Sequence, residues 1–405
     1  MFSLFLHLFL VVQPPVSEIV VVGGEGNHCR EDPGCFNRLH PDIPIAARAR
    51  PGQTILLKMR NALDVNLDPA VTADEPWMED SALGAVHALA GPVHIEGAEP
   101  GDVLAVTILD IDPGPFGLTI VSEIGFVSDV ISEPLEVLWR LNRKEAVSDS
   151  LPGVRVPNAS FPGVVTVLPG REELDTMLAR EAALAEAGGS VFAPHAPYAS
   201  PAEVCGPGGS HEAECLRTVP PREHGGNMDI RYLGVGVTIY LPCYVPGCGL
   251  GMGDMHFAQG DGEVSGTAIE MDADAIVTTA LIKDGPRLGR GPHYEGPVRL
   301  LDIPSRRFYA TTGFPLKRKG ELPPDMAYLK SDVAAGLENL SKDVSLAARN
   351  ALLEMIDYIT ETYGMTRAQA YIISSVAVDL RIGQLVDAPN VGVTALLPLD
   401  IFEAR

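Results

Sequence analysis

Short apolar runs separated by turn dipeptides fill two stretches of the chain. Residues 51–112 contain TILLKM and VLAVTILDI between PG, GP and GD pairs, and residues 229–303 contain RYLGVGVTIYLPCYV, GTAIEM and DAIVTTALI. Runs of this length, rich in branched residues and bounded by Gly and Pro, are typical of strands joined by turns. We therefore predict two β-rich blocks, at residues 51–165 and 221–335.

Helical patterns occur between and after these blocks. Residues 171–189 contain strong helix formers and end in Gly-Gly, which predicts one helix with its stop signal. Further on, apolar residues recur at helical spacing before Gly364, which stands at a C-cap position, and Thr366 opens a capping box with Gln369. Residues 341–385 are therefore predicted to form two helices, followed by a returning strand in VDAPNVGVTALLPLDIF.

These patterns together predict an α+β fold that is mainly antiparallel β, with two packed β-rich blocks and a C-terminal helical pair. The predicted division of the chain is an N-terminal arm and strand (1–50), a first β-rich block (51–165), a helix with a long loop (166–220), a second β-rich block (221–335), and C-terminal helices with a returning strand (336–405).

The N-terminal text FSLFLHLFLVV is apolar for about half the length that a membrane span requires. No Lys or Arg precedes Arg30, and QPPVSEIVV offers no small-x-small cleavage site, so the features of a signal peptide are missing. We expect this segment to be a strand or arm, and we expect no membrane partner.

The charge balance excludes several partners. The 30 Lys and Arg against 53 Asp and Glu give a formal net charge of −23, which repels nucleic acids and anionic membranes. The sequence also contains no P-loop, no GxGxxG opening a helix and no GxSxG elbow, which counts against nucleotide-dependent chemistry and a serine hydrolase. A small neutral or cationic ligand is the expected partner.

Six cysteines are too few for a disulfide scaffold, but two pairs are close in sequence, Cys29 with Cys35 and Cys205 with Cys215. If both pairs are oxidised, the protein resides outside the cytosol, and if the thiols are free it resides in the cytoplasm. The cytoplasm is the favoured expectation from sequence.

Residues able to bind a metal or transfer a proton are most concentrated in the segment GMGDMHFAQGDGE. Asp254 and His256 are two residues apart, so on a strand both side chains lie on one face and can point at one ion. Gly260 and Gly262 let the chain turn and bring Glu263 near, where a carboxylate can act as general base. The alternative is a polar hairpin tip whose acids face solvent.

A second segment, VHALAGPVHIEGAEPGD, contains His87 and His94 with Glu99 close behind. Residues an odd number apart on a strand face opposite sides, so only one histidine is expected at a site. We assign His87 as a metal ligand and Glu99 as a reserve general base, and we expect His94 to be an exposed strand residue.

A third segment, TVPPREHGGNMDI, places His224, Asn227 and Asp229 around a Gly-Gly turn. The Asn227 amide can donate hydrogen bonds to an oxyanion, and Asp229 can bind a metal or orient a histidine. An Asx-turn that leads into a strand is the structural alternative.

Cys243 and Cys248 precede the acidic loop, so a cysteine nucleophile with His256 as its base competes with the metal site. For Cys243 the alternative role is that of a small buried apolar residue.

The three segments together resemble the acetamidase/formamidase family, as do NRLHPDIP and VDAPNVGVTALLP, so that the resemblance extends over nearly the whole chain. The resemblance implies a hydrolase of linear amides that releases ammonia and a carboxylate, with a β-rich fold and a homo-oligomeric assembly. It gives functional weight to His87, Glu99, Asn227, Asp229, Asp254, His256 and Glu263. The full PPREHGGN and HFAQGDGE words favour the formamidase-like branch.

One departure from the family pattern concerns the pocket. The chain reads FPGVVTVLPG where family members commonly carry His-Pro-Gly, so that Phe161 replaces a histidine. This change indicates an altered pocket group, and the substrate can therefore differ from formamide or acetamide.

The sequence thus predicts a hydrolase in which His87, Asp254 and His256, with Asp229, hold a divalent metal, zinc first, with calcium in an oxygen-only site as the alternative. Glu263 is the predicted base, and Asn227 and His224 complete the predicted catalytic group. The competing hypotheses are a non-catalytic protein that binds a small amide or metal, and a cysteine amidase.

Overall fold

The structure of the chain is a computed structural model. It describes residues 19–72, 82–121, 135–149, 156–187, 189–259, 263, 266–285, 288, 291–301, 307–321, 332–364, 378–399 and 402. The N-terminal arm expected from FSLFLHLFLVV lies outside these ranges.

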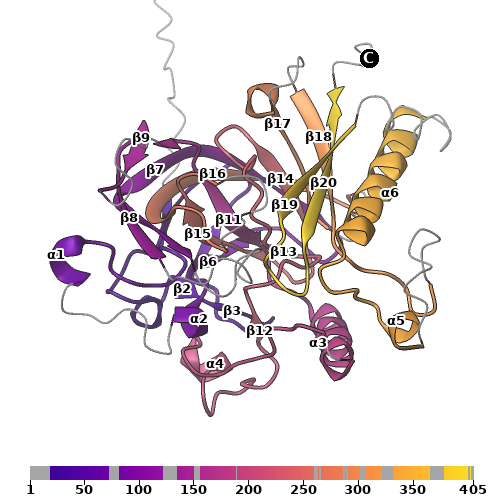
Figure 1. Cartoon of the computed structure of the whole chain (residues 1–405), viewed down its shortest axis with the longest axis horizontal. Coiled ribbons are helices and arrows are strands. Elements are labelled where there is room, and N and C mark those ends of the chain that lie inside the picture. The colour runs from indigo at the N-terminus through magenta and orange to yellow at the C-terminus, as the bar shows by residue number, and fades with distance from the viewer. Residues whose placement is uncertain are drawn as a thin grey trace, which may run out of the picture.

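Strands dominate the described part of the chain (Figure 1). Their bounds are β1 Val20–Val22, β2 Cys35–Phe36, β3 Arg38–Leu39, β4 Ala47–Ala49, β5 Thr54–Met59, β6 Leu89–Ile95, β7 Val103–Val121, β8 Leu135–Leu141, β9 Glu145–Val147, β10 Val156–Pro157, β11 Phe161–Thr166, β12 Leu216–Arg217, β13 Gly225–Asn227, β14 Thr238–Pro242, β15 Cys248–His256, β16 Glu270–Ile282, β17 His293–Pro297, β18 Arg307–Gly313, β19 Asp379–Gln384 and β20 Gly392–Pro398.

The helices are fewer and mostly short. They are α1 Pro69–Thr72, α2 Ala82–Ala85, α3 Arg171–Glu186, α4 Ala202–Cys205, α5 Asp332–Gly336 and α6 Val344–Tyr363, with 3-10 turns at Cys29–Glu31 and Val298–Leu300. No helix in the described ranges has the length and apolar character needed to cross a membrane.

Antiparallel pairing joins most of the strands. Eighteen described strands form one hydrogen-bonded network, and β3 pairs with β12 separately. Among the described pairs, only β1 with β5 and β4 with β6 run parallel. The predicted mainly antiparallel α+β fold is therefore confirmed. The long strand β7 pairs with both β14 and β16, so the two predicted β-rich blocks share strands of one network.

The pattern of side chains along β16 explains how it supports a site. Met271, Ala273, Ala275 and Val277 alternate into the largest apolar cluster, and the acidic residues between them face the other side. This apolar cluster gathers side chains from β5, β7, β14, β15 and β16. Glu270, the first residue of β16, is the buried member of this acidic face and pairs with His256 at the end of β15.

The C-terminal part confirms one predicted helix and corrects the extent of the other. Helix α6 starts at the N-cap Asp343, whose side chain accepts a hydrogen bond from the backbone of Leu346, and it ends at Gly364, which has φ of 68°. It lies along β18 and β20 (Figure 1). The second predicted helix, up to residue 385, is wrong at its end, because Asp379–Gln384 form β19, whose backbone pairs with β20. Residues 365–377 lie outside the described ranges.

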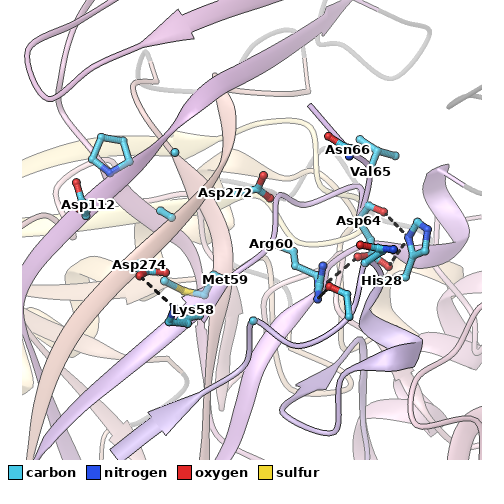
Figure 2. A pocket seen from close by; sticks show the side chains of 16 residues that line it. His28, Lys58, Met59, Arg60, Asp64, Val65, Asn66, Asp112, Asp272 and Asp274 are labelled. Atoms are coloured by element: carbon cyan, nitrogen blue, oxygen red, sulfur yellow. Dashed lines mark hydrogen bonds and ion pairs between the residues drawn. The ribbon is translucent and has the colours of Figure 1, made fainter. Parts of the chain in front are cut away.

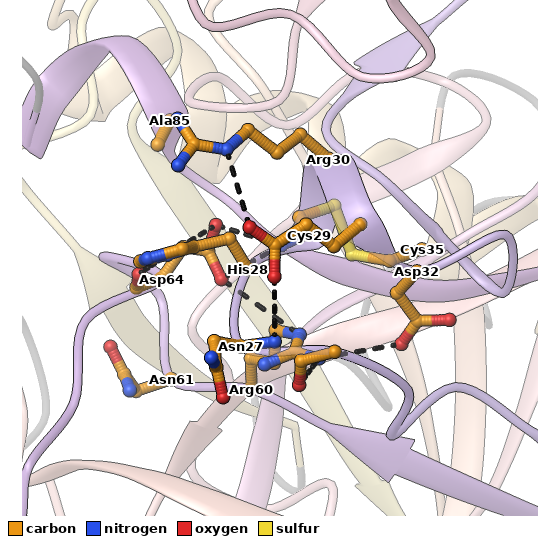
Figure 3. A network of polar contacts seen from close by, with 12 residues as sticks. Asn27, His28, Cys29, Arg30, Asp32, Cys35, Arg60, Asn61, Asp64 and Ala85 are labelled. Atoms are coloured by element: carbon orange, nitrogen blue, oxygen red, sulfur yellow. Dashed lines mark hydrogen bonds and ion pairs between the residues drawn. A yellow bond between two sulfur atoms is a disulfide. The ribbon is translucent and has the colours of Figure 1, made fainter.

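All six cysteines are paired, as Cys29 with Cys35, Cys205 with Cys215 and Cys243 with Cys248. The first bridge closes an N-terminal loop (Figure 3). Both carboxylate oxygens of Asp64 accept a hydrogen bond from the Cys29 backbone, and the Arg60 guanidinium binds carbonyls of the same loop. The bridge packs against Ala88, so it supports the chain just before β6.

A buried ion pair attaches α3 to the segment that leads into β13. The Arg222 guanidinium donates to both carboxylate oxygens of Glu181, at 2.7 and 2.9 Å, and both residues are buried. Arg180 and Glu223 form a second pair alongside it. The predicted helix at residues 171–189 is confirmed, and its buried face carries charge as well as Leu174, Met177 and Leu184.

We predict that Glu181→Gln lowers the free energy of unfolding by about 3–5 kcal/mol, because it leaves the buried Arg222 charge without its partner. Urea denaturation followed by circular dichroism measures the change. The control is Asp149→Asn, since the Arg140 and Asp149 pair is also bidentate but exposed. It should leave the unfolding free energy nearly unchanged. Equal losses in the two variants would contradict the prediction.

Candidate active site

Five carboxylates and two histidines from separate segments gather around the end of β15. Asp254 and His256 come from β15, and Glu270 is the β16 residue that pairs with His256. Asp229 follows β13, and Glu263 belongs to the loop between β15 and β16. The remaining members are Asp387, from the loop between β19 and β20, and His87, from the segment before β6.

His256 is the centre of this group. The side-chain nitrogen of Gln259 donates a hydrogen bond to the Asp229 carbonyl, so the side-chain oxygen of Gln259 points toward His256. The His256 Nδ1–H donates to this Gln259 oxygen at 2.9 Å. The Nε2 atom is therefore the ring nitrogen that faces the carboxylates. Four carboxylate oxygens surround that atom, Asp254 Oδ1 and Glu270 Oε2 at 3.3 Å, Glu263 Oε1 at 3.8 Å and Asp229 Oδ1 at 4.0 Å.

Burial and mutual repulsion alter the acidity of the group. Burial, with the Glu263 and Asp387 charges, raises the pKa of Asp229 well above its usual value. Burial likewise raises the pKa of Glu263, and it raises the pKa of Asp387 to about 7. Burial opposes ionisation of Asp254 as well, yet the neighbouring histidines hold its pKa below the ordinary value. Burial lowers the pKa of His256, but the Glu270 and Asp254 charges outweigh it and raise that pKa well above its usual value, so this ring is the positive charge that the carboxylates share in the absence of a metal ion.

Several buried polar atoms at the centre have no hydrogen-bond partner among the described residues. They are His87 Nδ1, His256 Nε2, Glu270 Oε2, Asn227 Oδ1 and both carboxylate oxygens of Asp229. Unpaired buried polar atoms are costly, so such a concentration needs an explanation. A cation among them would satisfy the oxygens and the imidazole nitrogens together.

The donor set fits a divalent metal ion. The ligand atoms of Asp254, His256 and Glu270 lie within 4.8 Å of one another, and those of Asp229, His256 and Glu263 form a second such group. Imidazole nitrogen combined with carboxylate oxygen suits zinc and similar divalent metals. The hydrogen bond from His256 to Gln259 is the kind of outer contact that orients a ligating imidazole.

Three of the carboxylates sit on unusual backbone. Asp229, Asp254 and Glu263 have φ of 49°, 54° and 43°, in the left-handed region that residues other than glycine rarely adopt. Such conformations cost about 1–3 kcal/mol each and persist where the surroundings enforce them. The backbone is thus bent to aim carboxylates at one point.

Strand β11 forms the wall beside these carboxylates. A Cβ atom on Gly163 would lie 2.3 Å from Asp254 Oδ2 and 2.5 Å from Asp229 Oδ1, so the backbone closely approaches both side chains. Two residues earlier, Phe161 pairs with His256 in register, and its ring meets the imidazole edge-on at 5.0 Å. The altered pocket group expected from sequence is therefore an apolar ring in contact with His256.

The structure brings together most of the residues selected from sequence. His87, Asn227, Asp229, Asp254, His256 and Glu263 lie in or beside the carboxylate group. Glu99 does not, because it lies on an exposed turn where its backbone donates to Asp102. His224 is buried, but its ring is hydrogen-bonded to Thr166, and its charged neighbours are Arg222, Glu223 and Arg180. His94 is half-buried among Arg48, Glu96 and Glu99.

Sequence reasoning missed Glu270 and Asp387. Glu270 occurs in a run that predicts an ordinary strand, and only its pairing with His256 reveals its place. Asp387 occurs in VDAPN, which resembled the family and carried no assigned role. The proposed cysteine nucleophile is contradicted, because Cys243 and Cys248 are bonded to each other and offer no thiol.

A large cavity lined by described residues is separate from this group. It has a volume of about 690 Å³, and its wall contains Lys58, Arg60, Asp112, Asp272 and Asp274 (Figure 2). Its charges are largely paired within the protein, for example Lys58 with Asp274 at 4.0 Å. No member of the carboxylate group lines it.

Comparison with known proteins identifies relatives of the whole chain. The acetamidase/formamidase family model matches residues 25–404. The chain is 33% identical to a formamidase of Methylophilus methylotrophus over 92% of this chain and 90% of that protein. It is 32% identical to an acetamidase of Mycolicibacterium smegmatis, over 83% and 84%. A solved gamma lactamase from Delftia acidovorans is 30% identical with a TM-score of 0.64, covering 96% of this chain and 94% of that one.

We predict that Gly163→Ala sharply weakens binding of a divalent ion, because the added methyl group would push the carboxylates of Asp229 and Asp254 apart. Zinc content after equilibrium dialysis measures the effect. Gly336→Ala is the matched control, since a Cβ there meets nothing within 4 Å, and it should bind the ion like the wild type. Unchanged zinc content in Gly163→Ala would refute the role given to this glycine.

Proposed function

This chain belongs to the acetamidase/formamidase family, and we propose that it hydrolyses a small linear amide to ammonia and a carboxylate with the help of a divalent metal ion. The named formamidase and acetamidase relatives make it an amidase. The observation that carries the metal proposal is the buried His256 Nε2 atom, which faces four carboxylates and has no hydrogen-bond partner among the described residues.

The ion would be held by His87, Asp254 and His256, as the sequence predicts, and we add Glu270 to this set. Glu270 and Asp254 are the two carboxylates nearest the His256 Nε2 atom, both at 3.3 Å. Asp229 remains a further ligand at the edge of the set. Zinc is the first choice because two imidazoles take part. When bound, such an ion lowers the pKa of a water and stabilises negative charge on the amide oxygen.

Glu263 is the proposed general base. Its carboxylate lies 3.8 Å from His256 Nε2, farther than the two nearest carboxylates, which leaves it available for proton transfer. It would take a proton from the attacking water and return it to the departing nitrogen. The enclosed position of the group favours a small substrate, since its histidines and carboxylates are all at least nine-tenths buried.

We also propose an oxidising compartment for this protein. Three disulfides satisfy the condition that the sequence sets for a location outside the cytosol. This proposal replaces the cytoplasmic expectation, which rested on free thiols.

We predict that the wild-type protein releases ammonia from at least one of formamide, acetamide and propionamide, and that prior chelation abolishes the release until zinc is added back. A coupled ammonia assay before and after dialysis against a chelator measures both effects. Undiminished release after removal of all bound metal would contradict the metal proposal and leave an amidase of another mechanism.

We predict that Glu263→Gln lowers kcat at least about 100-fold while zinc content stays near that of the wild type, because the variant loses a proton acceptor but keeps its shape. Ammonia release and elemental analysis of the same samples test this. Full activity in the variant would end the assignment of Glu263 as base, and lost zinc would make it a ligand instead.

A further inference from the structure

Among the described residues, the side-chain amide of Asn227 has a hydrogen-bond partner for its nitrogen and none for its oxygen. Its Nδ2 donates to Asp387 Oδ2 at 2.7 Å, and the side chain is 3% exposed. This hydrogen bond runs from the amide nitrogen to Asp387, the direction that an ionised carboxylate requires, so the amide oxygen faces away. That oxygen, Oδ1, is buried and has no hydrogen-bond partner in the part of the chain that the structure describes.

The free oxygen lies beside the proposed reaction centre. Asn227 precedes Met228 and Asp229, whose backbone N–H groups both donate to the carbonyl of Gly163, the glycine that touches the two site carboxylates. Asp387 itself interacts electrostatically with Asp254 and His256. A hydrogen-bond acceptor is thus placed at the edge of the group, where a substrate would meet it.

Asp387 is held rigidly in the position that it needs. Its backbone N–H donates to Gln384 Oε1, and the Gln384 amide nitrogen donates to the carbonyl of Asn390. Asn390 in turn donates to the carbonyl of Pro221, just upstream of Asn227. The loop between β19 and β20 is therefore fastened to the segment that carries Asn227.

We propose that Asn227 Oδ1 accepts a hydrogen bond from the N–H of the substrate amide, and that Asp387 is the positioning residue that keeps this oxygen turned toward the substrate. The proposal rests on the amide hydrolysis proposed above and names its substrate class, compounds that carry N–H on the scissile bond. A substrate without N–H leaves the buried oxygen unpaired, so the site discriminates against esters and fully substituted amides.

Asn61 provides a matched control from outside the site. It is also buried, and its Nδ2 donates to a carboxylate, that of Asp272, at 3.0 Å. Its oxygen, however, already accepts from the Val65 backbone. Figure 3 shows Asn61. Asp272 lines the separate cavity of Figure 2, which contains no member of the carboxylate group.

The test measures formate release from formamide and from methyl formate, which is similar in size and has no N–H. In Asn227→Leu we expect kcat/KM for formamide to fall roughly 10- to 100-fold, and that for methyl formate to stay within about twofold of wild type. Asp387→Asn should act in the same direction, because an amide at 387 lets Asn227 turn its nitrogen toward the substrate. The two control variants, Asn61→Leu and Asp272→Asn, should leave the ratio between the substrates unchanged.

The outcomes separate the two proposals. Equal losses on both substrates in Asn227→Leu and Asp387→Asn overturn this inference and leave the amidase standing, since a structural defect lowers both. A fall in zinc content of Asn227→Leu also overturns it, because Asn227 would then be a metal ligand. No hydrolysis of formamide, acetamide or propionamide by the wild-type protein overturns the proposed function and this inference with it. If acetamide or propionamide is hydrolysed and formamide is not, the same comparison is made between that amide and its methyl ester. Should Asn227→Leu fail to fold, Asp387→Asn alone decides.

Discussion

The concentration of buried negative charge around His256 is the constraint on which the rest of the structure depends. Asp229, Asp254, Glu263 and Glu270 all lie within 4.0 Å of one imidazole nitrogen, and each is nine-tenths buried or more. Carboxylates in such a place repel each other and lose their hydration, so they need either protons or a cation. Three features hold this unfavourable arrangement in place. They are the left-handed backbone of the carboxylate residues, the close approach of Gly163 on β11, and the buried ion pairs of α3.

The residues that support the carboxylate group lie at different distances from it. Gly163 and Phe161 touch the site residues and set its walls. Gln259 accepts a hydrogen bond from His256 Nδ1 and so orients the ring. Farther out, Arg222 and Glu181 attach a helix to the segment that leads to Asn227 and Asp229. Rigid support of this kind is what a site requires when its geometry must survive internal repulsion.

Local features of the site could be predicted from the sequence, and features formed by long-range pairing could not. The spacing of Asp254 and His256 on a strand places both side chains on one face, and this needs no knowledge of neighbouring strands. Glu270 depends on the register between β15 and β16, which no single segment encodes.

Long-range contacts also explain two predictions from local sequence that the structure does not support. Glu99 stands in a word shared with the family, yet its local role is a turn in which Asp102 accepts from its backbone. Residues 379–384 have a helical context in sequence, but pairing with β20 makes them a strand, an example of tertiary contacts overriding local preference.

The position of Asp387 in the chain has a consequence for the timing of synthesis. Every other member of the carboxylate group is translated well before it, and only the closing of the loop between β19 and β20 places Asp387 beside Asn227. A chain still emerging from the ribosome therefore holds an incomplete site with an unanchored Asn227. The orientation of the Asn227 amide therefore depends on a contact between segments 160 residues apart, which forms only when the loop between β19 and β20 docks.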